Sequence, residues 1–224
     1  MTQKEITDNV RDRLGIERLN AMQRTMQQVK SKRIVLLAPT GSGKTVGFAL
    51  QLLRAVGAPC GDVQGVVIAP SRELVIQTAE VLRRLAVGLK VSALYGGHSV
   101  TEEKGTLSVT PDIVVATPGR LLDHMQRDRI DLSGVRALVL DEYDKALELG
   151  FQDEMSRIVR RMRHLSLVIL TSATELPELP PFVDMKEAKV VDFRDAPSLA
   201  TARGAVDVMR VESPTADKLE TLSH

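Results

Sequence analysis

Hydrophobic residues follow two alternating patterns along this chain. Short runs of valine, isoleucine, leucine and alanine are continuous, which is typical of strands buried on both faces of a sheet. Between them, longer stretches carry apolar residues three and four positions apart, as amphipathic helices do. The predicted strands are residues 34–38, 65–69, 91–95, 113–116, 137–140, 167–170 and 190–191 with Phe193, and the predicted helices are residues 45–56, 71–87, 119–127 and 152–163.

This alternation of strands and helices predicts an α/β fold, with a mostly parallel sheet covered by helices on both faces. The order fades toward the end of the chain: residues 175–181 are rich in proline, and the helical and strand periodicities are lost beyond Asp195. We therefore expect one domain over residues 1–194, including an N-terminal region over residues 1–30, and a linker over residues 195–224.

Composition limits the kinds of partner that the chain can bind and the cellular compartment in which we expect it. The 224 residues contain 30 Lys and Arg against 29 Asp and Glu, a net charge of +1, so a polyanion must be held by a few placed contacts. The single cysteine, Cys60, excludes an internal disulfide framework and a multi-cysteine zinc site. No apolar run has the length of a membrane span, and the start does not resemble a signal peptide. We expect a cytoplasmic chain without a membrane partner.

A glycine-rich loop stands between the first predicted strand and the helix that follows it. Residues 38–45 read Ala-Pro-Thr-Gly-Ser-Gly-Lys-Thr, the Walker A pattern with alanine at its first position. Backbone N–H groups of such a loop point at phosphate oxygens, a lysine (here Lys44) reaches the β- and γ-phosphates, and a hydroxyl (here Thr45) ligates Mg²⁺. The predicted nucleotide contacts are Thr40, Gly41, Ser42, Gly43, Lys44 and Thr45. The alternative is a glycine-rich turn that binds nothing.

An acidic pair follows the apolar strand at residues 137–140. Asp141 and Glu142 have the Walker B arrangement, in which the aspartate holds Mg²⁺ and the glutamate orients or deprotonates the attacking water. The carboxyl ends of parallel strands share one edge of a sheet, so this pair and the phosphate loop are expected to lie together. Taken alone, the segment also fits an acidic turn that caps a helix.

These residues, with others in the same order, resemble the N-terminal RecA-like domain of DEAD-box RNA helicases. The resemblance covers nearly the whole chain. It includes residues 38–45 (motif I), residues 70–74 with Gln77 (Ia), Gly96-Gly97, residues 117–120 (Ib), residues 141–144 (II) and residues 172–174 (III). It implies ATP and Mg²⁺ as cofactors and RNA as partner.

Two elements depart from the family pattern. In the adenine-recognition element, Gln23 is kept and two prolines are lost, so the resemblance implies that the Gln23 amide reads the adenine edge. Ile6 is expected where the family has an aromatic residue that stacks on the base. Motif II reads Asp-Glu-Tyr-Asp, and we expect the bulky Tyr143 to repack the contact of Asp144 with motif III.

The remaining motifs imply contacts with the RNA backbone and a coupling element. Taken singly, each also has an ordinary structural reading as an ion pair, a helix-start turn or a cap. A basic run over residues 157–163 fits a solvated helix face better than an RNA patch. The implied RNA contacts are Pro70, Arg72, Gly97, Thr117, Pro118, Gly119 and Arg120, and the residues that would couple ATP state to RNA are Asp144, Ser172 and Thr174.

The sequence therefore predicts the ATP-binding and RNA-binding core domain of an ATP-dependent RNA helicase, monomeric as a domain. Glu142 and Lys44 are the expected catalytic residues. Nothing after motif III matches the second RecA-like domain of the family, which carries the arginine fingers, so we expect a piece of a longer protein with very slow hydrolysis on its own. Two alternatives stay open: a related DNA helicase, and a non-enzymatic nucleotide- or RNA-binding module.

Overall fold

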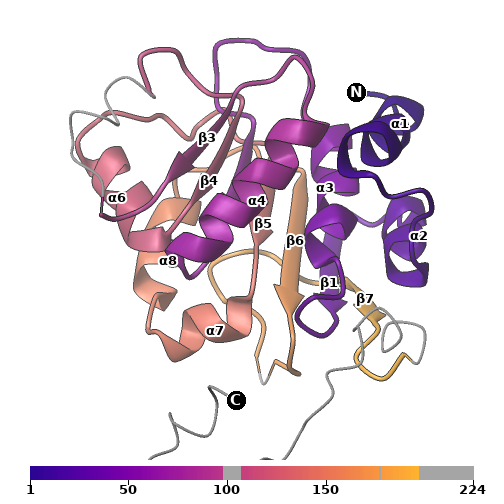
Figure 1. Cartoon of the computed structure of the whole chain (residues 1–224). Helices are drawn as coiled ribbons and strands as arrows, with labels where there is room; N and C mark the ends of the chain where they lie inside the picture. The colour runs from indigo at the N-terminus through magenta and orange to yellow at the C-terminus, as the bar shows by residue number, and fades with distance from the viewer. Residues whose placement is uncertain (98–106, 177, 197–224) are drawn as a thin grey trace, which may run out of the picture.

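The computed structural model describes residues 1–97, 107–176 and 178–196 (Figure 1). Most of the linker expected at residues 195–224 therefore lies outside the described residues. Seven strands form one sheet in the order β3-β4-β2-β5-β6-β1-β7, and every pairing is parallel. The strands are β1 (Arg33–Leu37), β2 (Gly65–Ile68), β3 (Val91–Leu94), β4 (Ile113–Ala116), β5 (Ala137–Leu140), β6 (Leu167–Ser172) and β7 (Lys189–Asp192).

Within the described residues, the four predicted helices are present together with three that were not predicted. The last predicted helix ends at Val159 rather than at residue 163, because Arg161 and Met162 turn back to bond the carbonyls three residues earlier. None of the described helices has both the length and the apolar character needed to cross a membrane. The helices are α1 (Gln3–Leu14), α2 (Ala21–Gln28), α3 (Lys44–Ala55), α4 (Arg72–Leu85), α6 (Pro118–Gln126), α7 (Tyr143–Glu148) and α8 (Gln152–Val159), of which α1, α2 and α7 are the additional ones.

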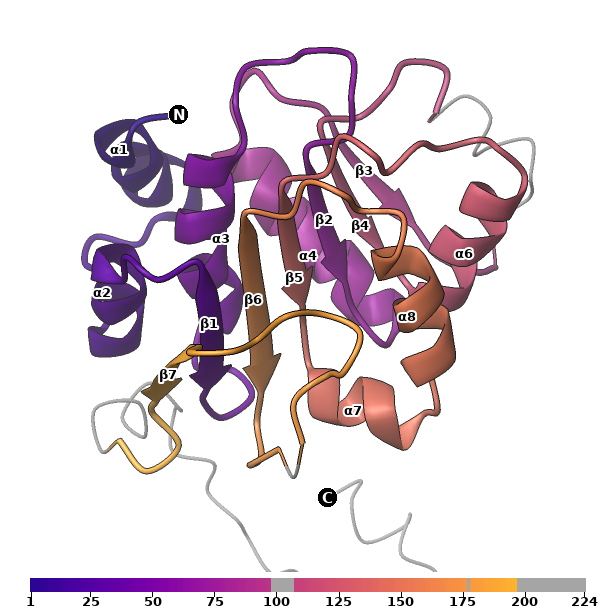
Figure 2. The ribbon, with the colours of Figure 1, turned by 180° about the vertical axis from the view of Figure 1, so that it is seen from behind.

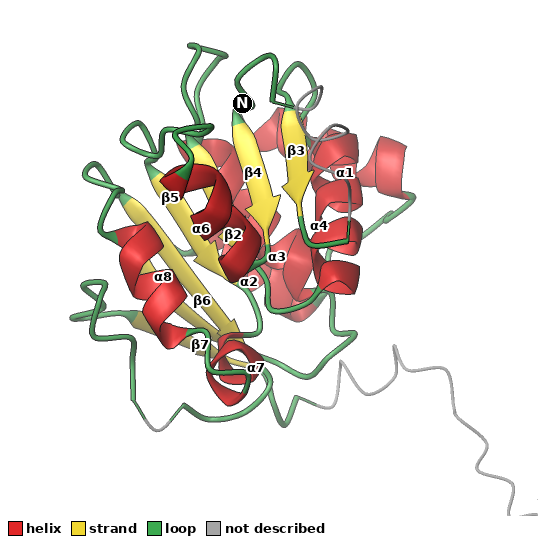
Figure 3. Cartoon of the chain, turned by 90° about the vertical axis from the view of Figure 1, so that its left-hand side faces the viewer, coloured by secondary structure: helices red, strands yellow, loops and turns green. Residues whose placement is uncertain are grey.

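Helices cover both faces of the sheet, as expected. Figures 1 and 2 show α1 to α4 on one face and α6 and α8 on the other, and Figure 3 shows the sheet between the two layers. Each layer closes its own hydrophobic core, one around Phe48 and Leu82 and the other around Leu121 and Ile158. The α/β fold predicted from the sequence is confirmed.

The two N-terminal helices have clear local start signals. Thr2 caps α1 and Asn20 caps α2, each in a reciprocal capping box with the residue three positions later, Glu5 and Gln23. Gly15 ends α1 in the left-handed conformation, with φ of 69°. Both helices pack against α3, and α1 also packs against α4.

This packing buries Ile6. Its side chain is 1% exposed and belongs to the core between the sheet and α1 to α4. A residue buried in this way stabilises the attachment of α1 and is not available to stack on a base.

Tyr143 is buried in the opposite core. It is 1% exposed, at the start of α7, among residues of β5, α6 and α8. Burial raises the pKa of its hydroxyl to about 12.

We predict that Tyr143→Ala lowers the free energy of unfolding by about 3–5 kcal/mol, because it leaves a ring-sized cavity in a closed core. Urea denaturation followed by circular dichroism measures this loss. Tyr143→Phe, which keeps the ring, should cost far less. Equal losses in the two variants would show that the hydroxyl, not packing of the ring, stabilises this position.

Candidate functional site

The predicted site residues gather at one edge of the sheet. Apart from Gln23, which lies in α2 ahead of the first strand, the motifs are at the ends of strands. Parallel strands bring their carboxyl ends to the same edge, which is the lower one in Figures 1 and 2. The strand order then divides this edge in two. The phosphate loop, the acidic pair and residues 172–174 follow β1, β5 and β6, whereas the predicted RNA contacts follow β2, β3 and β4.

The phosphate loop is closed by backbone geometry. Ala38 N–H, at its start, donates to Ser172 O at 3.1 Å and so continues the β1–β6 ladder. Gly41 and Gly43 have φ of 76° and 85°, a region that glycine favours. A Cβ atom on Gly43 would stand 2.5 Å from Gln23 Nε2, so a larger residue here would displace the Gln23 amide.

Lys44 folds back onto its own loop. Its side chain is 7% exposed, and Nζ donates to Ala38 O at 2.8 Å and to Pro39 O at 3.0 Å. Burial lowers the pKa of Lys44, and the nearby carboxylates of Asp141 and Glu142 partly oppose that shift. These two bonds use two of the three N–H donors of the ammonium, which leaves one for a phosphate oxygen.

The start of α2 is tied to the phosphate loop through Gln23 and Asn20. Gln23 is 4% exposed; its Oε1 accepts from Asn20 N at 3.0 Å and its Nε2 donates to Gly43 O at 3.3 Å. Asn20 Nδ2 donates to Ser42 O at 3.0 Å, and its Oδ1 accepts from Gln23 N at 2.8 Å. Gln23 is thus beside the loop, but both ends of its amide are engaged within the chain. Asn20 was not predicted; its place at the helix start, three residues before Gln23, was the available signal.

The acidic pair is organised by Thr171, another residue that the sequence did not single out. Thr171 Oγ1 donates to Asp141 Oδ1 at 2.6 Å and accepts from Glu142 N at 3.0 Å. Burial raises the pKa of Asp141 to about 6, against the opposing effect of the Thr171 hydrogen bond. Glu142 has φ of 48°, an uncommon backbone state for this residue type, which turns the chain abruptly from β5 into α7.

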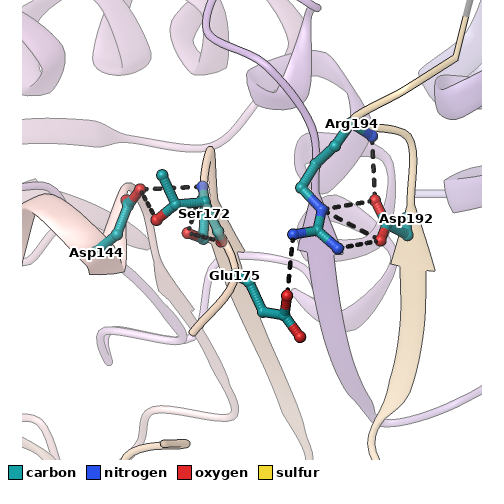
Figure 4. A network of polar contacts seen from close by, with 6 residues as sticks. Asp144, Ser172, Glu175, Asp192 and Arg194 are labelled. Atoms are coloured by element: carbon teal, nitrogen blue, oxygen red, sulfur yellow. Dashed lines mark hydrogen bonds and ion pairs between the residues drawn. The ribbon is translucent and has the colours of Figure 1, made fainter. Parts of the chain in front are cut away.

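Asp144 contacts the residues after β6 directly (Figure 4). Its Oδ2 accepts from Thr174 Oγ1 at 2.9 Å, from Thr174 N at 3.2 Å and from Ala173 N at 3.2 Å. Burial alone would raise the pKa of Asp144, but these hydrogen bonds bring it below its ordinary value. The Tyr143 ring lies in the core, and the Asp144 carboxylate bonds to residues 173–174, the segment it was expected to contact.

Ser172 shapes the same turn from within. Its Oγ donates to Thr174 O at 2.6 Å and accepts from Thr174 N at 3.1 Å. The next residue after this turn, Glu175, lies 3.6 Å from Arg194, which also pairs with Asp192 at the end of β7 (Figure 4). The turn after β6 is thus bonded to Asp144 of α7 and, through Glu175, to Arg194 just after β7.

The other half of the edge brings together an exposed arginine, a ring and a glycine. The Arg72 guanidinium lies 5.2 Å from the centroid of the Tyr95 ring, a cation–π contact. Arg72 Nη1 would be 3.1 Å from a Cβ atom on Gly97, whose φ is 96°. Arg72 and Gly97, predicted separately, are therefore neighbours.

The third predicted RNA element begins α6. Thr117 is the N-cap residue, its N–H donates to Leu94 O at 3.0 Å, and Pro118 occupies the first turn. Gly119 is exposed, and Arg120 pairs with Asp123 at 3.5 Å. The side chains of Pro118 and of Pro70 are buried, so these two prolines shape the backbone of the surface and offer little side-chain surface themselves.

The chain matches the family model described as DEAD/DEAH box helicase over residues 19–178. It belongs to the DEAD/DEAH box helicase family. The resemblance found in the motifs is confirmed, and the matched region begins four residues before Gln23.

Relatives and solved structures agree with this membership. The chain is 36% identical over 167 residues to the ATP-dependent RNA helicase CshA of Listeria monocytogenes, covering 73% of this chain and 32% of that protein. It is 41% identical over 146 residues to the ATP-dependent RNA helicase DbpA of Escherichia coli, covering 64% of this chain and 32% of that protein. This DEAD/DEAH box chain thus spans about a third of the length of the curated relatives it matches.

The fold of this DEAD/DEAH box chain is shared with solved helicases. A hypothetical ATP-dependent RNA helicase from Sulfolobus tokodaii superposes with a TM-score of 0.76 at 29% identity, covering 86% of this chain and 57% of that one. A DEAD box protein from Methanococcus jannaschii superposes with a TM-score of 0.70 at 32% identity, covering 77% and 48%. The single parallel sheet with helices matches these RecA-like domains.

We predict that Asn20 stabilises the phosphate loop separately from its role as a helix cap. Asn20→Ser keeps a capping hydroxyl but is too short to reach Ser42 O, so hydrogen exchange should become faster in residues 38–46 and stay unchanged in α2. Asn20→Ala removes both interactions, should speed exchange in both segments, and should cost about 1 kcal/mol of stability. Exchange followed by mass spectrometry measures this. Unchanged loop protection in Asn20→Ser would contradict the role of the Ser42 contact.

Proposed function

We propose that this chain is the ATP- and RNA-binding core domain of an ATP-dependent RNA helicase, which hydrolyses ATP to clamp and unwind RNA together with a second RecA-like domain. The observation that carries the proposal is the shared carboxyl edge, where the phosphate loop, the acidic pair and the exposed Arg72 follow strands β1, β5 and β2 of one sheet. One half of the edge would hold the nucleotide and the other half the RNA backbone.

The nucleotide half has the groups needed for a triphosphate. The N–H groups of residues 40–45 lie at the start of α3, where the helix dipole favours an anion, and Lys44 Nζ is within the same loop. Gln23 lies against Gly43, so a purine placed beside the loop would meet its amide once the contacts with Asn20 and Gly43 are exchanged. This supports ATP as the ligand, with Thr40, Gly41, Ser42, Gly43, Lys44 and Thr45 around the phosphates.

The same half also fits Mg²⁺. The described residues contain no group of three His, Cys, Asp or Glu side chains that forms a metal cage. Mg²⁺ in phosphoryl-transfer sites uses few protein oxygens, with phosphates and waters completing its shell. The Thr45 hydroxyl and the Asp141 carboxylate, whose second oxygen is not used by Thr171, are the expected protein groups. When bound, ATP–Mg²⁺ supplies the scissile phosphoanhydride bond and neutralises charge on its phosphates.

The residues of the chain would then divide the work of hydrolysis. Glu142, fixed by Thr171 at the end of β5, would orient a water and accept its proton. Lys44 would bind the terminal phosphates. Asp144 would pass a change at the acidic pair to Ser172 and Thr174 through its hydrogen bonds to residues 173–174.

The RNA half offers contacts of the kind that bind a backbone without reading sequence. Arg72 and Arg120 supply charge, Thr117 a hydroxyl, and Gly97 and Gly119 open backbone. These contacts are few, as the near-neutral charge of the chain requires. The chain spans about a third of the length of its relatives, which supports a second RecA-like domain joined through residues 195–224.

We predict that Glu142→Gln reduces the RNA-stimulated ATPase rate of the full-length protein by about 10²–10⁴-fold, the range for loss of a general base. Magnesium-dependent ATP binding, measured by titration calorimetry, should survive in this variant. Lys44→Ala is the matched control and should lose binding itself. Equal hydrolysis by Glu142→Gln and the unmodified protein would refute the catalytic assignment, and retained ATP affinity in Lys44→Ala would refute the phosphate site.

We predict that Tyr95 holds Arg72 in position for RNA. Tyr95→Leu removes the ring and should weaken binding of single-stranded RNA severalfold, in line with a cation–π contribution of about 0.5–1 kcal/mol at an exposed site. Tyr95→Phe keeps the ring and should bind as the unmodified chain does. Fluorescence anisotropy measures both. Weakening shared by the Phe variant would assign the effect to the tyrosine hydroxyl instead.

A further inference from the structure

A cluster of exposed arginines lies at the edge of the sheet opposite the candidate site. One arginine is on α8, three are in the turn from α8 to β6, and one directly precedes β5. All five therefore belong to connections that lead into the amino ends of strands. In Figure 2 this is the side where β5 and β6 begin. The cluster, termed here the amino-edge arginines, consists of Arg136, Arg157, Arg160, Arg161 and Arg163.

The backbone under these arginines is held in place by packing. Ile158, Val159 and Met162 are buried in the core beneath α6 and α8, and Met162 N donates to Val159 O at 2.9 Å. Ser166 N and Oγ both bond to the carbonyl of Arg136, which joins the two connections. The arginine side chains are therefore presented to solvent from a fixed frame.

No hydrogen bond or ion pair involves these arginine side chains within the described residues. Other exposed arginines do have acidic partners: Arg11 pairs with Asp12, Arg84 with Glu80 and Arg127 with Asp123. The nearby carboxylate of Asp131 influences Arg161 electrostatically, but its oxygens accept from Ser133 N and Oγ at 2.9 and 2.8 Å. No ion pair thus compensates the positive charge of the cluster in the part of the chain that the structure describes.

Two adjoining hollows lie among the arginines. One, of about 480 Å³, is lined by Arg136, His164, Ser166 and Gln64 and also by Asp62. The other, of about 300 Å³, is lined by Arg161 and Arg163 together with Asp128 and Asp131, and the two share Ser133. The five amino-edge arginines outnumber the three carboxylates that line the hollows, so the surface keeps an excess of positive charge. Arginine binds phosphate oxygens through a fixed fork of N–H groups.

We propose that the amino-edge arginines form a second RNA-binding surface, which holds the phosphate backbone of RNA that extends beyond the helicase site. The sequence alone favours a solvated helix face, because a basic run usually has no partner. The structure adds that these side chains make no ion pair within the described residues, that their backbone is fixed, and that they outnumber the carboxylates lining the hollows. The connection into β5 supplies Arg136. The choice of RNA rests on the proposed function. Because the two edges are opposite, RNA at this surface would not compete with RNA at Arg72 and Arg120.

The test compares three variants in RNA affinity, measured by anisotropy with a single-stranded RNA long enough to reach both edges, at several salt concentrations. The first is Arg160→Gln with Arg161→Gln and Arg163→Gln. The second, which removes the same charge elsewhere, is Arg11→Gln with Arg13→Gln and Arg84→Gln. The third is Arg72→Ala with Arg120→Ala at the candidate site. Thermal unfolding checks that each variant is folded.

The amino-edge variant should raise the RNA Kd roughly tenfold at low salt and reduce the salt slope by about 0.7 for each phosphate that the surface no longer binds. The charge-matched control should change affinity much less. An amino-edge variant that binds as the control does would overturn the proposal and leave the function intact if the Arg72 and Arg120 variant is weakened. Weakening confined to the amino-edge variant would support this surface and refute the proposed RNA contacts. No RNA binding by the unmodified chain would overturn both.

Discussion

The position of β6 between β1 and β5 is the constraint on which the site depends. Its parallel ladders align Ser172 with the end of β1 and Leu170 with the end of β5. As a result, the phosphate loop, Asp141 and Thr171 lie at one level although they are far apart along the chain. The backbone hydrogen bonds of the sheet place these groups, and their side chains need only short additional bonds to meet.

Those additional bonds form a chain of contacts around the phosphate loop. Asn20 and Gln23 donate to loop carbonyls at residues 42 and 43, and Lys44 donates to the carbonyl at residue 38. Thr171 bridges Asp141 and Glu142. The amides of Asn20 and Gln23 and the ammonium of Lys44 are thereby hydrogen-bonded within the protein, whereas Ser42 Oγ in the loop and Asp144 Oδ1 are buried without a partner. Ligand binding in such a site is an exchange of hydrogen bonds, and its free energy is the difference between the two sets.

Much of the fold and of the site was predictable because both are encoded locally. Continuous apolar runs marked β1 to β6, since a strand covered on both faces has little polar surface. The edge strand β7, exposed at three of its four residues, was marked only by Val190 and Val191 with Phe193 nearby. Helices α3, α4, α6 and α8 showed clear amphipathic spacing. By contrast, α2 and α7 are short, with eight and six residues, and α1 carries only two buried residues, so their patterns were weak. Thr171 and Asn20 were missed because their roles arise from contacts with residues 30 and 22 positions away.

The sequence by itself determined the order of the strands along the chain, the loop that fits a phosphate, the acidic pair and the family. Glycine spacing and hydrophobic runs act over a few residues, so they can be read directly. Only the tertiary structure decided that Ile6 belongs to the core, that Asp144 keeps its contact beside Tyr143, and that the arginines of residues 157–163 join Arg136 at the far edge. These outcomes depend on which side chains the packing of the fold brings together and which it leaves without a partner. A short stretch of sequence does not determine either of them.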